Sequence, residues 1–213
     1  DFDQVAGGKW TAALPKAALK DLEQFSVRMA TRYFQTLSEA CRKVDPHHLN
    51  HGMRWAGVPP AWAVEGMKSF DVFSMNCYMD KVPREVTGRI QTLLGRPALI
   101  GEWHFGALDV GLPASGIGHL RNQVERAKAY SVYLEDAAAN PNCVGAHWFT
   151  LYDQSALGRF DGENYNIGFL DVCLRPYQEM SQAAVASHER MYEVAAGKVS
   201  PFQANLEYLP KLY

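Results

Sequence analysis

Apolar residues recur at helical spacing in the first long segment of the chain. Between Pro15 and Val44, apolar side chains return every three or four positions, at Leu19, Leu22, Phe25, Met29, Tyr33 and Leu37. This is the period of one face of an α-helix. Pro15 and the Asp45-Pro46 step stand at the two ends of the pattern, where such residues begin and end helices. The pattern therefore predicts a helix over residues 15–44.

The rest of the chain alternates short apolar runs with further helical patterns. The sequence predicts strands over 49–54, 71–76, 98–101 and 144–150, and helices over 58–68, 84–94, 119–139 and 176–195. Loops rich in glycine or polar residues cover 104–118 and 151–172. The run Ala98-Leu99-Ile100-Gly101 is wholly apolar, as expected of a parallel strand covered on both faces. Strands that alternate with helices indicate an α/β fold with a parallel sheet.

The number of predicted strands suggests half of a larger architecture. A (β/α)8 TIM barrel has eight strand–helix units in about 250 residues, whereas this sequence predicts four strands and opens on a helix. We therefore expect residues 1–213 to form a single partial (β/α)8 domain. It would be the C-terminal half of the barrel, about strands five to eight with their helices, with the N-terminal half missing. A half-barrel exposes an apolar sheet edge, which favours association with a second copy or with a complementary N-terminal half.

Composition narrows the classes of partner. The formal net charge of −2 provides no basic footprint for nucleic acid or for a membrane surface. No apolar run approaches the roughly 20 residues of a membrane span. The first residues, Asp1-Phe2-Asp3-Gln4, do not have the pattern of a signal peptide, and the localisation stays open.

Metal, cofactor and disulfide chemistry is not expected. Four cysteines lie far apart with no CxxC pair, at Cys41, Cys77, Cys143 and Cys173, and those in apolar stretches are expected to be buried thiols. The histidines His47, His48 and His51 match no zinc-ligand spacing. A glycine-rich phosphate loop is also missing, which disfavours a metal- or phosphate-dependent barrel enzyme.

Glu102 is the strongest candidate for chemistry, because it directly follows the apolar run 98–101. In (β/α)8 enzymes the reactive residues lie at the C-terminal ends of the strands. Retaining glycosidases use one carboxylate to attack the anomeric carbon, and a second, about 5–5.5 Å away, to protonate the leaving oxygen. Two interpretations are open: Glu102 is such a nucleophile, or it forms an ion pair with a loop arginine.

Several segments make the first interpretation specific. Residues Arg96 to Gly106 (RPALIGEWHFG) resemble the seventh-strand nucleophile motif of clan A glycoside hydrolases. Gly145-Ala146-His147-Trp148-Phe149 and the loop from Tyr152 to Asn164 are similar to the eighth strand and loop of β-agarases and related β-galactosidase-like enzymes. The segment 45–54 is similar to their fifth-strand entry, and 70–78 to their sixth strand. The resemblance extends from about Arg32 to Met180.

The resemblance assigns roles to individual residues. It implies that Glu102 is the nucleophile, that Tyr78 hydrogen-bonds it and keeps it ionised, and that Trp148 floors the subsite of the reacting sugar. Six further residues are expected to face the same pocket and to hydrogen-bond sugar hydroxyls: Arg54, Asn76, His104, Asp153, Gln154 and Glu163. Two of these have structural alternatives, since Arg54 could pair with a carboxylate inside the barrel and Glu163 could shape a tight turn.

One part of the family pattern is missing. Clan A enzymes carry the acid/base on an Asn-Glu pair after the fourth strand, and no Asn-Glu step occurs in this sequence. The first hypothesis is a retaining β-glycosidase that hydrolyses galactose-containing poly- or oligosaccharides, with this chain supplying the nucleophile half of the site. The alternative is a non-catalytic carbohydrate-binding or structural half-barrel, inactive because the acid/base is absent. No cofactor is expected in either case.

Overall fold

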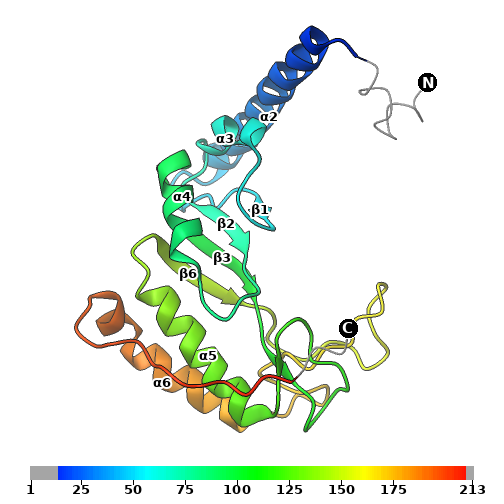
Figure 1. Cartoon of the computed structure of the whole chain (residues 1–213), viewed down its shortest axis with the longest axis vertical. Coiled ribbons are helices and arrows are strands. Elements are labelled where there is room, and N and C mark those ends of the chain that lie inside the picture. Colours follow the sequence, from blue (N-terminus) through cyan, green and yellow to red (C-terminus); the bar gives the residue numbers. More distant parts are fainter. Residues whose placement is uncertain (1–13, 210–213) are drawn as a thin grey trace.

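A computed structural model describes residues 14–209, and its first element is the long helix α2 (Lys16–Val44). Its start after Pro15 and its end at Asp45 confirm the predicted helix. The second half of α2 buries Ala30, Phe34 and Ser38, whereas its first half projects from the body of the molecule (Figure 1). Much of the apolar stripe is therefore open to solvent, including Phe25, which is 61% exposed.

A four-stranded parallel sheet forms the centre of the fold. Its strands are β1 (Arg54–Trp55), β2 (Phe73–Asn76), β3 (Ala98–Trp103) and β6 (Cys143–Trp148), in the order β1-β2-β3-β6. Helices α3 (Ala61–Met67), α4 (Arg84–Leu94) and α5 (Gln123–Ala138) connect successive strands, and α6 (Gln178–Ala195) packs beside α5 (Figure 1). The predicted α/β fold with a parallel sheet is confirmed. The first strand is shorter than predicted, because only two of its residues pair with β2.

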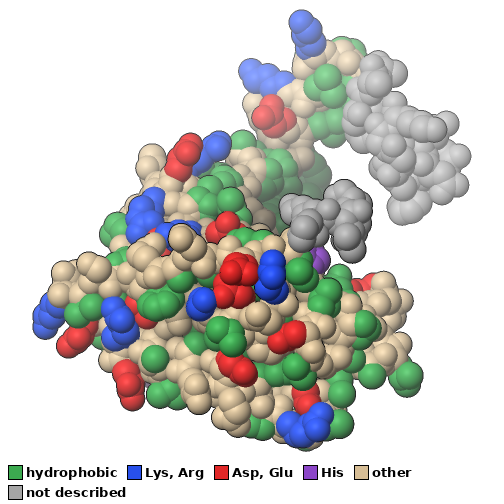
Figure 2. Space-filling model, turned by 60° about the horizontal axis from the view of Figure 1, so that its bottom comes forward, with side chains coloured by type: hydrophobic (Ala, Val, Ile, Leu, Met, Phe, Trp, Pro, Cys, Tyr) green, Lys and Arg blue, Asp and Glu red, His purple; other side chains and the backbone are tan. Residues whose placement is uncertain are grey.

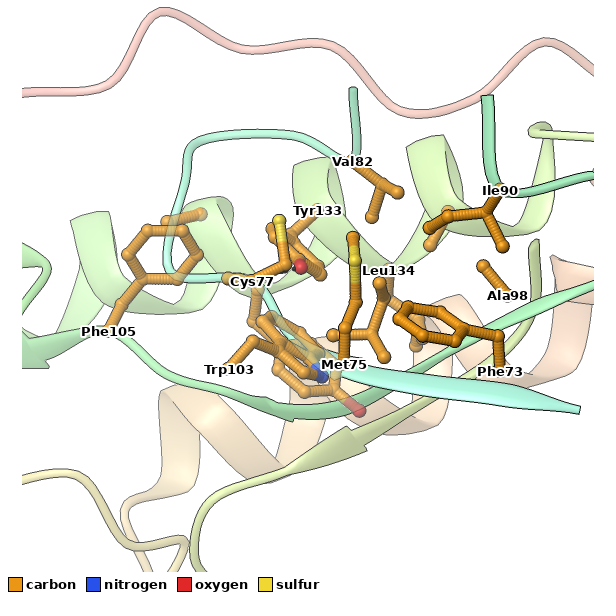
Figure 3. Packing of buried hydrophobic residues seen from close by; sticks show 14 of the residues in the cluster. Phe73, Met75, Cys77, Val82, Ile90, Ala98, Trp103, Phe105, Tyr133 and Leu134 are labelled. Carbon is orange, nitrogen blue, oxygen red and sulfur yellow. Dashed lines mark hydrogen bonds between the residues drawn. The ribbon is translucent and has the colours of Figure 1, made fainter. Parts of the chain in front are cut away.

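The main core lies between one face of the sheet and the helices α4 and α5. Alternate residues of β2, Phe73 and Met75, point into it, and Trp103 at the end of β3 continues it (Figure 3). The Tyr133 side chain of α5 stacks on Trp103 with ring centroids 4.1 Å apart, and its hydroxyl donates to the Cys77 carbonyl oxygen at 2.8 Å. Because successive strand residues face opposite sides, Ser74 and Asn76 lie on the other face of the sheet.

The segment between β3 and α5 differs from its prediction. A second parallel pair, β4 (Gly106–Ala107) and β5 (His119–Leu120), lies within what was expected to be a loop followed by a helix. The helix predicted from residue 119 is therefore wrong at its start: α5 begins at Gln123, where the Asn122 side chain accepts a hydrogen bond from the Glu125 N–H. His119 and Leu120 pair with Gly106 and Ala107 instead of extending the helix. Helical periodicity does not reveal this pairing, because the partner residues lie outside the periodic segment.

The segment after α6 returns across the molecule in an extended conformation (Figure 1). The Phe202 N–H donates to Glu135 Oε2 at 2.7 Å, and the Leu209 N–H donates to the His119 carbonyl oxygen at 2.8 Å. These contacts bring residues 202–209 alongside α5 and β5. The end of the described chain thus lies beside the loops that follow β2 and β3.

The four cysteines are free thiols, with Cys77 buried. Within residues 14–209 no helix has the length and apolarity to cross a membrane, and no cluster of three potential metal-ligating side chains occurs in this same range. On the face shown in Figure 2, positive and negative side chains are interspersed rather than gathered in a patch of one sign.

Candidate active site

Glu102 lies at the C-terminal end of β3, and a shift in strand register directs it toward β2. Met75 pairs with Ile100, but the next residue of β2, Asn76, pairs with Glu102. Gly101 therefore has no partner residue on β2, as in a β-bulge. Bulges change the direction of the side chains that follow them, often next to functional sites. The shift places Glu102 beside Asn76 on the face of the sheet opposite the main core.

Three side chains bind the Glu102 carboxylate. The Asn76 amide and the Tyr78 hydroxyl both donate to Oε2, each at 2.7 Å, and Arg54 Nη2 forms an ion pair with Oε1 at 2.6 Å. Burial, together with the adjacent Glu102 carboxylate, raises the pKa of Tyr78, so that its hydroxyl remains a donor at neutral pH. The Glu102 side chain keeps 15% of its surface exposed, and the carboxylate is both fixed and accessible.

Gly101 is required by the path of the Arg54 side chain. A Cβ at position 101 would lie 2.4 Å from Arg54 Cδ and 2.8 Å from Ser74 Oγ. Both distances are far below ordinary van der Waals contact. The residue directly before Glu102 therefore has no side chain because the arginine that binds Glu102 passes across it.

Trp148 packs against the main core, on the same face of the sheet as Trp103. Trp148, at the end of β6, meets Trp103 edge to face at 4.7 Å. Its Nε1 donates to the Ile167 carbonyl oxygen at 2.9 Å, which fixes the orientation of the indole. Trp148 is partly buried, and its contact with a sugar ring remains a prediction.

A buried arginine holds the loop to which Trp148 is bonded. Arg126 of α5 is fully buried, and its guanidinium donates to the carbonyl oxygens of Phe105 at 2.8 Å and Gly168 at 2.5 Å. The same guanidinium lies 5.7 Å from the Trp148 ring centroid. Burial lowers the pKa of Arg126 to about 10, which leaves it a cation at neutral pH. Arg126 thus holds Trp148 and the segment around Gly168 in place, a role that the sequence did not suggest.

Two of the residues expected to bind sugar are buried supports instead. His104 is 3% exposed, and its Nε2 accepts the Ile117 N–H at 3.0 Å. Burial and the nearby Arg126 lower the pKa of His104 to about 3, so that the ring is neutral. Asp153 is also buried and accepts hydrogen bonds from the Gly168 N–H and the Tyr177 hydroxyl. Contact of either side chain with substrate remains a prediction.

Gln154 and Glu163 pair with each other in the loop after β6. Gln154 Nε2 donates to Glu163 Oε2 at 2.9 Å, and Arg159 forms an ion pair with the same oxygen at 2.7 Å. The Glu163 N–H also donates to Asp161 Oδ1 at 3.3 Å. These contacts agree with the structural alternative for Glu163, a residue that shapes a turn, and its contact with sugar remains a prediction.

The structure thus brings four of the predicted site residues into direct contact: Arg54, Asn76, Tyr78 and Glu102. Two residues that support the site were not among the predicted ones, Gly101 and Arg126. Gly101 stands in the quoted motif, whereas Arg126 has no local signal, since its partners Phe105 and Gly168 lie far away along the chain.

Two curated proteins are similar to this chain. No family model matches the chain. β-Agarase B of Vibrio sp. (strain JT0107) is 37% identical over 182 residues, which is 84% of this chain and 19% of the relative. β-Agarase A of the same strain is 34% identical over 206 residues, which is 90% of this chain and 21% of the relative. The chain therefore spans about a fifth of the length of these curated relatives.

Solved structures give the same result. An exo-β-agarase superposes with a TM-score of 0.78 at 36% identity, covering 87% of this chain and 26% of the other. The agarase AgWH50C gives 0.76 at 34% identity, covering 85% and 28%. A β-D-glucuronidase of Dictyoglomus thermophilum, at 15% identity and a TM-score of 0.52 over 74% of this chain and 29% of the other, shares the fold alone. The homologues of this chain are therefore β-agarases, a class of glycoside hydrolase.

Proposed function

We propose that this chain carries the nucleophile of a retaining β-glycosidase that acts on galactose-containing chains such as agarose. The observation that carries the proposal is the Glu102 carboxylate, bound by Arg54, Asn76 and Tyr78 at the end of a buried parallel strand. The names of the agarase relatives support the substrate class. In a complete (β/α)8 barrel, the four-stranded sheet of this chain would form the second half.

The contacts of Glu102 suit a nucleophile. In the first step a Glu102 oxygen forms a bond to the anomeric carbon while the bond to the leaving oxygen breaks. The three donors hold the carboxylate in one orientation before the attack, which removes the entropic cost of positioning it. Trp148 lies at the end of the adjacent strand β6, where the resemblance assigns it to the subsite of the reacting sugar.

The acid that protonates the leaving oxygen is proposed to come from outside this chain. The sequence lacks the Asn-Glu step on which the family carries it. Strands β1 and β6 are the two edges of the sheet, and barrel closure would require further strands along both. Apolar side chains are exposed on α2, such as Phe25 and Met29, and on β6 at Val144. A complementary half of the barrel, or a second copy of the chain, would cover them.

A substrate that needs no acid tests the nucleophile separately. In 2,4-dinitrophenyl β-galactoside the leaving phenolate is stable as an anion, so that attack by Glu102 transfers the galactosyl group and releases dinitrophenolate with its bonding electrons. We expect mass spectrometry of a digest to find one galactosyl adduct on the peptide that carries Glu102, and no adduct in Glu102→Gln. Methyl β-galactoside, whose alkoxide requires a proton, is the matched control that should not react. A galactosyl adduct at another residue, or none, would refute the assignment of Glu102.

The second candidate function is non-catalytic binding of a galactan. It is favoured by the missing acid and by the engagement of both Glu102 oxygens with protein donors. It predicts that agaro-oligosaccharides bind to the chain and to Glu102→Gln with equal affinity, while dinitrophenyl β-galactoside leaves no adduct. Isothermal titration calorimetry on both proteins separates the two functions, and an adduct on Glu102 would exclude the second.

A further inference from the structure

The C-terminal segment 202–209 is fixed to helix α5 and runs from there toward the loop that follows β2 (Figure 1). Near its start, the Phe202 N–H donates to Glu135 Oε2 at 2.7 Å. Near its end, the Glu207 N–H donates to Glu125 Oε2 at 3.0 Å. Both acceptor glutamates are buried residues of α5. The segment is therefore anchored at two points on the body of the fold.

The loop 77–83, between β2 and α4, carries the tyrosine that donates to the nucleophile. Cys77 at its start and Val82 near its end are buried, whereas residues 79–81 between them are exposed. Tyr78 directly precedes this exposed stretch. The backbone conformation of Tyr78, and with it the direction of its phenol ring, therefore depends on how residues 79–81 are held.

Two side-chain hydrogen bonds from the C-terminal segment hold the exposed stretch. Tyr208 donates its hydroxyl to Asp80 Oδ1 at 2.7 Å, and Lys81 Nζ donates to Gln203 Oε1 at 3.0 Å. Burial and the adjacent Asp80 carboxylate raise the pKa of Tyr208, so that its hydroxyl remains a donor at neutral pH. The partners are 128 and 122 positions apart in the chain. Only tertiary contacts therefore keep the loop beside the segment.

The loop connects Tyr208 to the nucleophile. The Tyr78 hydroxyl donates to Glu102 Oε2 at 2.7 Å, and Asp80, the acceptor of Tyr208, lies two positions after Tyr78. A hydrogen bond weakens steeply as its distance and angle depart from the ideal. A small displacement of the loop would therefore weaken the contact of Tyr78 with the carboxylate, which has to be oriented before it attacks.

We propose that Tyr208 is a positioning residue for Glu102, which holds the loop 77–83 so that the Tyr78 hydroxyl stays bonded to the nucleophile. The inference rests on the proposed function and goes beyond it, because it gives the C-terminal segment a part in the reaction. Tyr208 does not touch the reacting atoms, and Asp80 is the residue through which it acts on the loop.

Single-turnover labelling of the 213-residue chain with 2,4-dinitrophenyl β-galactoside tests the proposal. We expect Tyr208→Phe, which keeps the ring and removes the hydroxyl, to lower the labelling rate at saturation about threefold, the effect of one lost hydrogen bond. The concentration that gives half the maximal rate should not change. Asp80→Ala, at an exposed position, should give the same loss, whereas Asp80→Asn keeps an acceptor oxygen and should retain most of the rate.

A second measurement shows whether Tyr208 acts through Tyr78. In a Tyr78→Phe background the donor to Glu102 is already absent, so that adding Tyr208→Phe should cause no further loss of rate. Residues that act through one contact have such non-additive effects. The matched control is Tyr192→Phe on α6, where the side chain is 83% exposed, and it should label at the wild-type rate.

The alternative support for Tyr78 is the ring of His104, whose centroid lies 4.8 Å from that of Tyr78. If this contact alone fixes Tyr78, the Tyr208→Phe and Asp80→Ala proteins will label at the wild-type rate, which would overturn the positioning role and leave the proposed function intact. The same conclusion would follow if Tyr208→Phe changed only the half-saturating concentration, or lowered the rate equally in the Tyr78→Phe background. A wild-type chain that forms no adduct on Glu102 would overturn the proposed function, and the inference with it.

Discussion

Replacing Gly101 by alanine adds a methyl group where the Arg54 side chain now lies. The new Cβ would be 2.4 Å from Arg54 Cδ, 2.9 Å from Cγ and 2.8 Å from Ser74 Oγ. Carbon atoms in favourable contact are about 3.5–4.0 Å apart, so the arginine must withdraw by about 1 Å. Its Nη2 would then leave Glu102 Oε1, from which it is now separated by 2.6 Å.

The cost of this displacement has two parts. Arg54 is half exposed, so the lost ion pair is worth about 1 kcal/mol at most, which corresponds to roughly fivefold slower formation of the glycosyl adduct. Crowding of the strand by the extra methyl group costs about 1–3 kcal/mol of folding free energy. In a protein of this size, each kcal/mol lowers the melting temperature by about 2–4 °C.

Gly88→Ala is the matched control, the same substitution at a position with space. A Cβ there would meet only Asn142 Nδ2 at 3.8 Å, and Gly88 lies inside α4. Alanine should therefore stabilise the helix by about 0.5–1 kcal/mol and leave the adduct rate unchanged. The assay is single-turnover labelling with dinitrophenyl β-galactoside, combined with thermal unfolding. A Gly101→Ala protein that labels Glu102 at the wild-type rate would refute the argued role of Arg54.

Three further changes follow from the contacts around the site. Tyr78→Phe removes a donor to Glu102 and should slow labelling about tenfold or more, measured in the same single-turnover assay. The pKa of His104 is about 3 in the folded chain and about 6.5 in the unfolded chain. The free energy of unfolding should therefore fall as the pH decreases from about 6.5 to about 3, by up to about 1.4 kcal/mol per pH unit. Urea unfolding at several pH values measures this fall. Gly106→Ala places a Cβ against the Ser115 carbonyl oxygen and should cost about 3 kcal/mol, measured by urea unfolding at neutral pH.

Each of these has its own control. For Tyr78, the control is Tyr192→Phe on α6, where the side chain is 83% exposed, and it should label at the wild-type rate. An unaffected Tyr78→Phe protein would contradict the contact. For His104, the sign follows from burial of a neutral ring: at low pH the unfolded chain binds a proton that the folded chain excludes. The His104→Gln protein should therefore have a shallower loss of stability, and an identical pH profile would contradict the assignment. For Gly106, Gly88→Ala is again the control, and a Gly106→Ala protein of unchanged stability would count against the backbone contact.

Local pattern was sufficient for the regular elements. Helix α2 and helix α4 begin and end close to the predicted residues, because their apolar spacing and their flanking prolines and glycine act within a few positions. The position of Glu102 after an apolar strand is likewise a local feature. The start of α5 was missed because its first predicted residues, His119 and Leu120, pair with Gly106–Ala107, a contact that no window around residue 119 contains.

The sequence by itself determined that this is an α/β protein with a parallel sheet, and that Glu102 stands at a strand end. Only the tertiary structure decided how Glu102 is bound, since the register shift that sets it opposite Asn76 and the passage of Arg54 over Gly101 depend on strands far apart in sequence. The same holds for Arg126, whose partner Gly168 is 42 positions away. Periodicity in the sequence indicates which face of one helix or strand is buried. These contacts form between separate elements, and only the packing of those elements decides where they meet.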